Sequence, residues 1–234
     1  MNNTGLLPLE NQIKCVESFY DLLSTDFHNK INAIYWKRAL IGDFGEIVHK
    51  ISFQENIKIL NEDELLKLQL SENGELAREI LLNDLKVLKD HGAKPTLNII
   101  KNYERDTDFP FLPTDVYSFH VDRSPILVDT FLCTYFGEPS DIIPNSKATQ
   151  KILIPEIREE LKKLYDGNDA GFEAFLSEYF FDLHYALKPN AKPISLGIGN
   201  LWKLAVDCPE SKVLPCLHRA PKEKKGQSRL LLIC

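Results

Sequence analysis

The fold is decided by one stretch of the chain, Val116-Tyr117-Ser118-Phe119-His120-Val121-Asp122. Its aromatic and β-branched residues favour a β-strand. Successive side chains of a strand point to opposite faces, so His120 and Asp122 share one face while Val121 lies on the other. One strand is therefore predicted to present an imidazole and a carboxylate to the same point in space.

Further strand-like runs follow this stretch. Residues 125–137 form an apolar run that ends in glycine, and residues 213–219 and 229–234 form two more near the C-terminus. The polar residues 221–227 separate these last two runs, which predicts a hairpin. Alternation places Cys216 with His218 on one face of the first strand, and Arg229 with Leu231 and Ile233 on one face of the second.

His218 supplies a candidate third ligand for the pair formed by His120 and Asp122. The 6 histidines and 34 acidic residues among 234 produce roughly one His-x-Asp or His-x-Glu by chance, so the motif alone is weak. Its place among several predicted strands makes it informative. Two histidines and one carboxylate leave three octahedral positions open, as in the facial triad of non-haem iron(II) oxygenases.

Arg229 is predicted to face inward, on the same side as His218. A buried guanidinium destabilises a fold unless an anion neutralises it. A dicarboxylate co-substrate would do so through a two-pronged contact. Arg219 is a less suitable partner for such an anion, because it points to the face opposite His218.

These residues resemble the Fe(II)/2-oxoglutarate-dependent oxygenase superfamily. That superfamily uses His-x-Asp…His on a double-stranded β-helix, with Arg or Lys roughly ten residues beyond the second histidine. The resemblance implies that His120, Asp122 and His218 bind Fe(II). It also implies that Arg229, eleven positions after His218, binds the distal carboxylate of 2-oxoglutarate.

Most of the chain looks like an uncharacterised bacterial family known only as a domain of unknown function. That family has an early Trp-x-Arg, a His-x-Asp leading to Cys-Thr-Tyr-x-Gly, and a late His-Arg-Ser-Pro. The matching segments are residues 34–38, 120–137, 194–203 and 218–221. Ala220 stands where serine is expected, and the helical insert is longer than expected. The resemblance identifies no substrate.

The predicted fold class is mainly β with α: a single domain over residues 1–234 with a double-stranded β-helix core of the jelly-roll or cupin-like kind. Residues 1–113 form an N-terminal helical and mixed support region, and residues 114–234 form the core, with a helical insert at 155–187. Helical spacing is expected at 15–23 and at 62–91, with a break near Asn73-Gly74 and an end at Gly92. Short strands are expected at 33–36, 51–60, 138–147 and 194–205, and loop or edge structure at 94–113.

Several other residues have two open interpretations. Tyr117 and Tyr135 could bond the co-substrate or substrate through their hydroxyls, or pack in the core. Lys203 could face the cavity or solvent, whereas Arg123 is expected in a structural salt bridge. Four histidines without partners at ligand spacing are expected at the surface or in the core: His28, His49, His91 and His184. The aromatic group on the insert, Phe180, Phe181 and Tyr185, is expected in the core, with a lid over the substrate as the alternative.

Composition limits the possible partners. The net charge is −6, with no long basic run, which argues against a nucleic-acid substrate. Residues 1–10 lack the basic start and apolar core of a signal peptide, and no window approaches a membrane span. The five cysteines are scattered, without Cys-x-x-Cys spacing, which favours reduced thiols and a cytoplasmic location.

The sequence therefore predicts an iron(II)- and 2-oxoglutarate-dependent dioxygenase that hydroxylates a small-molecule or peptide substrate, with release of succinate and CO2. Two alternatives stay open. A cupin-like metalloenzyme without 2-oxoglutarate would not need the inward Arg229. A metal-binding module without turnover would be favoured by a fourth or fifth protein ligand.

Overall fold

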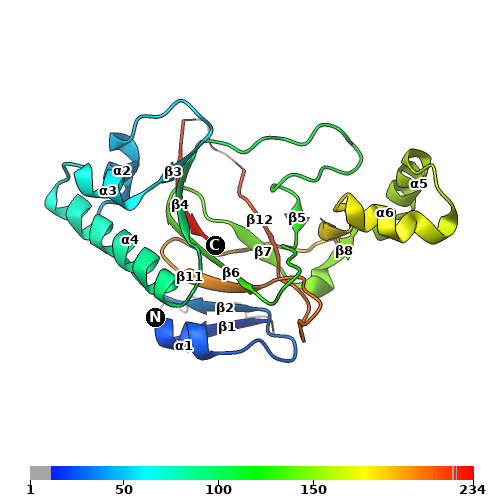
Figure 1. Ribbon diagram of the computed structural model, residues 1–234, viewed down its shortest axis with the longest axis horizontal. Helices are drawn as coiled ribbons and strands as arrows, with labels where there is room; N and C mark the ends of the chain where they lie inside the picture. The colour runs from blue at the N-terminus through cyan, green and yellow to red at the C-terminus, as the bar shows by residue number, and fades with distance from the viewer. Residues whose placement is uncertain (1–11, 223, 225) are drawn as a thin grey trace.

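Two β-sheets form the centre of the computed structural model, which describes residues 12–222, 224 and 226–234 (Figure 1). The larger sheet is antiparallel except where β1 lies parallel to β2. Within the described residues its order is β1 (Ile13–Val16), β2 (Ala33–Trp36), β11 (Leu201–Ala205), β6 (Asp129–Phe136), β13 (Arg229–Ile233), β4 (Thr96–Ile100) and β3 (Ile57–Leu60).

The smaller sheet is antiparallel throughout its described part. Its order is β10 (Ile194–Ser195), β7 (Asp141–Ile143), β12 (Leu217–Arg219), β5 (Phe119–His120), β9 (His184–Leu187) and β8 (Ala148–Gln150). The predicted class, mainly β with α, is thus confirmed.

The two C-terminal strands do not form the predicted hairpin. β12 pairs with β5 and β7, whereas β13 pairs with β4 and β6, so the chain crosses from one sheet to the other between them. The predicted turn 221–227 includes residues 223 and 225, which lie outside the described residues, as do residues 1–10. The prediction that the two strands share an interior still holds, because Cys216 and Leu231 belong to one buried cluster.

Four helices cover the outer face of the larger sheet: α1 (Phe19–Ser24), α2 (Phe44–Lys50), α3 (Glu62–Lys67) and α4 (Glu72–Asp90). In α4 the buried positions Ala77, Leu81, Asp84, Leu85 and Leu88 recur at helical spacing and form one face. The break between α3 and α4 lies at residues 68–71, not at Asn73-Gly74, because Ser71 caps α4. Gly92 follows the C-cap with φ 92°, as expected.

A second apolar cluster fills the space between the two sheets. It joins Leu132 and Leu231 of the larger sheet to Ile142 of the smaller sheet and Cys216, which precedes β12. Trp202 also belongs to it and stacks on Tyr35 at 4.4 Å between ring centroids. Strand alternation therefore turns Leu132 and Thr134 of β6 toward this interior, and Cys133 and Tyr135 toward the helices.

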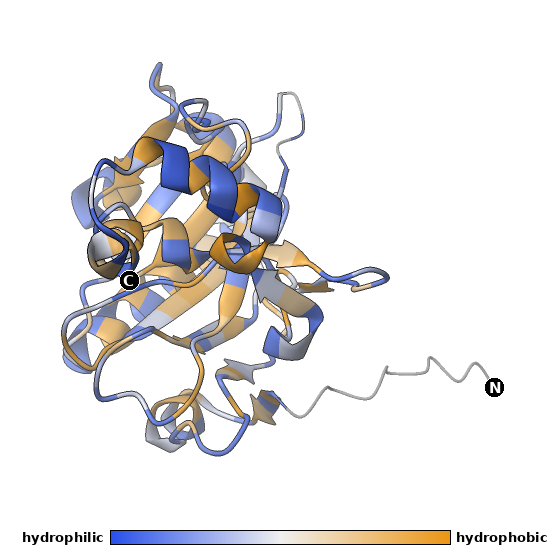
Figure 2. Cartoon of the chain, turned by 90° about the vertical axis from the view of Figure 1, so that its right-hand side faces the viewer, coloured by the Kyte–Doolittle hydropathy of each residue, from blue (hydrophilic) through white to orange (hydrophobic). Residues whose placement is uncertain are grey.

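The insert contains two helices, α5 (Pro155–Leu164) and α6 (Phe172–Glu178), and extends to one side of the sheets (Figure 1). It has its own core, which includes Leu161, Leu176 and Phe181 packed with Leu112. Figure 2, viewed from this side, shows hydrophobic segments concentrated in the strands and polar ones on the surrounding loops. The helical prediction for 155–187 is wrong at its end, because residues 184–187 form β9 and pair with β5.

Four other predicted elements need correction. Residues 15–23 begin in β1, and helix α1 starts only after the N-cap Ser18. β4 is not an edge, because β13 and β3 flank it on both sides. Residues 194–205 form two strands in different sheets, with Gly197 and Gly199 at positive φ between them. Of residues 116–122, only Phe119–His120 are strand.

Within the described part of the chain, none of the helices combines the length and the apolar character that crossing a membrane requires.

Candidate metal centre

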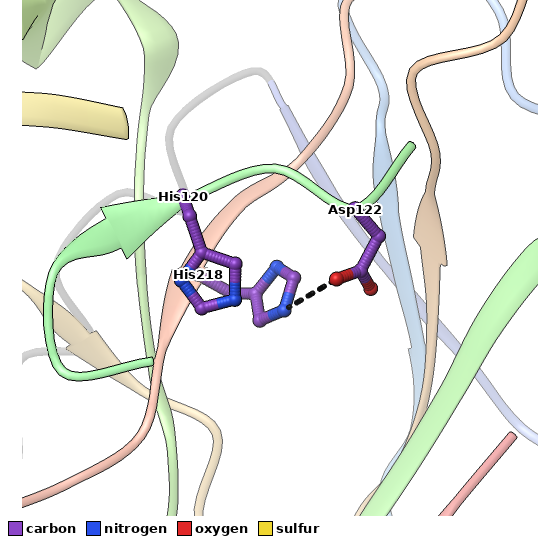
Figure 3. Close-up of side chains that lie close together, drawn as sticks. All are labelled: His120, Asp122 and His218. Atoms are coloured by element: carbon purple, nitrogen blue, oxygen red, sulfur yellow. Dashed lines mark ion pairs between the residues drawn. The ribbon is translucent and has the colours of Figure 1, made fainter. Parts of the chain in front are cut away.

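The structure brings together His120, Asp122 and His218 (Figure 3). One ligand atom from each residue lies within 4.8 Å of the other two. His120 on β5 is directly opposite His218 on β12, which puts both side chains on the same face of the smaller sheet. Their ring centroids are 4.5 Å apart. Residues 98 positions apart in the sequence thus form one cluster.

Asp122 lies two residues beyond the strand and is held by separate contacts. Its backbone carbonyl accepts a hydrogen bond from the amide of Asp207 at 2.8 Å. Its Oδ2 accepts a hydrogen bond from the hydroxyl of Thr130 at 2.6 Å. Its Oδ1 is 3.6 Å from Nε2 of His218, the pair marked in Figure 3. One carboxylate oxygen is therefore fixed by the protein and the other faces the cluster.

Backbone carbonyls set the tautomers of both histidines of the cluster. Nδ1 of His120 donates to the carbonyl of Ser118 at 2.8 Å, and Nδ1 of His218 donates to the carbonyl of Cys216 at 3.3 Å. A carbonyl only accepts, so Nδ1 carries a proton, and in the neutral form of each ring the lone pair is on Nε2. Histidines that bind metals are oriented in this way.

The electrostatics favour the protonation states that a metal requires. Burial and the neighbouring His218 lower the pKa of His120 to about 4. Burial acts to raise the pKa of Asp122, but the charge of His218 and the hydrogen bond from Thr130 outweigh it and lower that pKa. A neutral imidazole and an ionised carboxylate are the forms that coordinate a cation.

Arg229 is buried on β13 and surrounded by hydroxyl groups. Its Nη2 donates to Ser140 Oγ at 3.0 Å and to Thr134 Oγ1 at 3.3 Å, and its Nη1 lies 3.5 Å from the hydroxyl of Tyr103. Its Nε is buried without a hydrogen-bond partner. The charge of Glu138 acts on this guanidinium, but the carboxylate of Glu138 forms its ion pair with Lys224. Burial lowers its pKa. Such a site is ready to accept an anion.

The two candidate tyrosines lie in different places. The Tyr117 hydroxyl accepts a hydrogen bond from the amide of Tyr103 at 2.9 Å, so Tyr117 supports a residue that contacts Arg229. Tyr135 faces the helical layer, where its hydroxyl donates to Asp84 at 2.6 Å. The expectation that Tyr135 contributes its hydroxyl to the co-substrate site therefore disagrees with the direction of its side chain.

The Trp-x-Arg segment serves the same helical layer. Arg38 donates to both carboxylate oxygens of Asp84 at 2.8 and 2.5 Å, and to the carbonyl of Gly199 at 2.7 Å. Its guanidinium lies over the ring of Trp36. The side chains of Arg38 and Asp84 are 9% and 2% exposed. This buried network joins α4 to the loop before β11.

The remaining candidates lie outside the cluster. Lys203 faces the outer side of the larger sheet and donates to the carbonyls of Leu23 and Thr25. Arg219 pairs with Asp141 at 2.9 Å. Arg123 forms the expected salt bridges, with Asp182 and Asp207, each at 2.7 Å. In the aromatic group of the insert, Phe181 is buried and Phe180 is 57% exposed.

Four residues at the site were not singled out from the sequence as part of it: Tyr103, Thr130, Ser140 and His184. Hydroxyl residues are too common for their positions to be informative. The sequence contains one indication that His184 belongs to a strand, because it begins the run His-Tyr-Ala-Leu, which is compatible with a strand. That run was assigned to the helical insert. The structure places it opposite His120, on the side away from His218, with ring centroids 5.9 Å apart.

No protein-family model, curated protein or solved structure matches this chain.

Proposed function

We propose that this chain is an iron(II)- and 2-oxoglutarate-dependent oxygenase built on a double-stranded β-helix, and that it hydroxylates a small-molecule or peptide substrate. The observation that carries the proposal is the buried Arg229, which forms no ion pair with a carboxylate of the described residues and lies on the same side of β13 as Leu231, toward the space between the sheets.

The order of the strands supports this fold. Along the chain, β4, β5, β6 and β7 belong alternately to the larger and the smaller sheet. After the insert, β10, β11, β12 and β13 alternate in the same way. Two sheets wound together by strands that change sheet at each step are what a double-stranded β-helix requires.

The donor set supports iron. Two imidazoles and one carboxylate, with no fourth described side chain in the group, match a facial triad with open positions. Iron(II) held there would supply the activation of dioxygen, by which one substrate C–H becomes C–OH while 2-oxoglutarate is converted to succinate and CO2. The protein supplies orientation and a shielded site.

The residues of the candidate site have separate roles in this proposal. His120 and His218 would hold the metal through Nε2, with each Nδ1 proton kept on a backbone carbonyl. Asp122 would hold it through Oδ1, while Thr130 keeps Oδ2 in place. Arg229 would bind the far carboxylate of 2-oxoglutarate, with Thr134 and Ser140 orienting the guanidinium.

The two alternatives lack this support. A cupin-like metalloenzyme that does not use 2-oxoglutarate leaves the buried Arg229 without a role. A metal-binding module without turnover would be favoured by further protein ligands, and the group found among the described residues contains three side chains.

Arg229→Leu is expected to keep the metal but to weaken 2-oxoglutarate binding by about 2–4 kcal/mol, or roughly 30- to 1000-fold. The loss follows because the far carboxylate would no longer have a cation opposite it. The metal-free variant should be no less stable than the wild type, since the removal of an uncompensated buried charge outweighs the loss of the hydrogen bonds to Thr134 and Ser140. Anaerobic titration of the Fe(II)-loaded protein with 2-oxoglutarate measures the affinity.

Arg229→Lys should lose less affinity, because one prong of the contact survives. Arg219→Leu is the matched control: it removes an arginine from the other face of β12 and should leave the affinity unchanged. Equal affinity in wild type and Arg229→Leu would show that Arg229 is structural and would remove the basis for 2-oxoglutarate.

A further inference from the structure

Three side-chain atoms in the described part of the chain are buried and lack a hydrogen-bond partner: Ser118 Oγ, His184 Nδ1 and Arg229 Nε. Ser118 and His184 adjoin His120, whereas Arg229 is bonded to Ser140 beside β7. Leaving a buried polar group unpaired destabilises a protein by about 1–3 kcal/mol, so native structures rarely do so without a reason. A bound ligand would supply the missing partners.

The unpaired atoms fall on two sides of the metal ligands. Ser140, which binds Arg229, immediately precedes β7, and β7 borders β12 on the side away from β5. His184 begins β9, which borders β5 on the side away from β12. Across the smaller sheet the order is thus Ser140, His218, His120 and His184. The co-substrate proposed above takes the side of Arg229 and leaves the side of His184 open.

His184 is well placed to meet a ligand on that side. It is directly opposite His120 in an antiparallel pair, so its side chain shares the face that carries the metal ligands. It is 5% exposed, and its Nδ1 has no partner among the described residues. Its ligand atom does not join the group of three within 4.8 Å, which separates it from the metal ligands themselves.

Ser118 directly precedes β5, two residues before His120. Its carbonyl holds His120 Nδ1, which fixes the position of the backbone, while its buried hydroxyl has no partner. A hydroxyl and an imidazole can each donate and accept, so together they suit a group that does both.

We propose that Ser118 and His184 form the subsite for the oxidised substrate, on the side of the metal opposite Arg229, and that this substrate presents a polar group such as a hydroxyl, carboxamide or carboxylate to them. The assignment of this ligand as the oxidised substrate rests on the proposed function. The proposal that some polar ligand binds at Ser118 and His184 does not depend on the proposed function.

Asn32 is a buried polar residue whose side-chain amide is hydrogen-bonded, and it serves as a structural comparison for Ser118 and His184. Asn32 is 3% exposed, and its side-chain amide donates to Asn145 and to the carbonyls of Leu214 and Pro215. Removing such a group leaves acceptors unpaired and destabilises the fold. Removing an unpaired group does not.

Unfolding of the metal-free protein tests this difference without knowledge of the substrate. His184→Leu and Ser118→Ala should leave the melting temperature unchanged or raise it, by about 2–4 °C for each kcal/mol regained in a domain of this size. Asn32→Leu, the control, should lower it. A clear fall in melting temperature for both His184→Leu and Ser118→Ala would assign them structural roles and overturn the subsite.

A turnover assay tests whether a polar substrate binds at His184. The probe is a panel of the twenty L-amino acids, with stimulation of succinate formation over the substrate-free rate as the readout. The subsite predicts that polar amino acids stimulate the wild type. It also predicts that kcat/KM for these amino acids falls about 10- to 100-fold in His184→Leu and is partly restored in His184→Gln. Stimulation that is the same in wild type and His184→Leu overturns it. If no member stimulates, the unfolding result decides.

The two proposals fail in different ways. If the anaerobic Fe(II)-loaded wild type develops no charge-transfer absorption band when 2-oxoglutarate is added, the proposed function fails, while the unfolding test still stands. If the band is intact in wild type and His184→Leu but substrate turnover is also the same in both, only the subsite fails.

Discussion

His120→Ala, Asp122→Ala and His218→Ala are each expected to abolish stoichiometric Fe(II) binding while the fold stays intact. Each change removes one of three donors, and the two that remain cannot hold the ion against water. None of the three side chains contributes to the apolar clusters that hold the sheets together. Anaerobic calorimetric titration measures binding, and circular dichroism checks the fold.

His28→Ala is the matched control, because this histidine is exposed and far from the cluster in sequence. It should bind Fe(II) like the wild type. Thr130→Val should give an intermediate result, weaker by about 10- to 100-fold, since it frees Asp122 Oδ2 without removing a ligand. Undiminished binding in any one of the three alanine variants would remove that residue from the site.

Asp84→Ala is expected to destabilise the protein by about 3–5 kcal/mol. The change leaves Arg38 as an unpaired buried cation, and it also removes the acceptor of the Tyr135 hydroxyl. Urea unfolding at equilibrium should show a lower midpoint with an unchanged slope.

Two controls separate this effect from general damage to α4. Asp90→Ala removes the exposed partner of Lys86 on the same helix and should change stability by less than about 1 kcal/mol. The double variant Arg38→Met/Asp84→Leu should recover much of the loss, because no charge is left buried. An Asp84→Ala variant as stable as Asp90→Ala would contradict the structural role of the network.

The candidate metal ligands were predictable because their geometry is local. The spacing of His120 and Asp122 places them on one side of an extended chain even though only Phe119–His120 is strand. The inward direction of His218 and Arg229 followed from the same alternation. This prediction of side-chain direction was correct although the predicted hairpin was wrong, because the direction of a side chain depends on its position along its own strand and not on the partner strand.

Partner strands and buried faces were not predictable in the same way. β6 is buried along nearly its whole length on both faces, so its apolar run does not reveal that Thr134 faces the interior and Tyr135 the helices. Residues 184–187 are too short a run to separate strand from helix by spacing. His184 was missed for that reason, because its register opposite His120 is a tertiary contact between distant segments.

The central claim is tested most directly by adding 2-oxoglutarate to the anaerobic Fe(II)-loaded wild-type protein and recording its visible spectrum. Chelation of the metal by the keto acid requires adjacent open positions on the triad and produces a charge-transfer band. The account predicts that the band appears with 2-oxoglutarate and is followed in air by slow formation of succinate. A metal-loaded protein that shows neither the band nor succinate would contradict it and would favour a metalloenzyme that does not use 2-oxoglutarate.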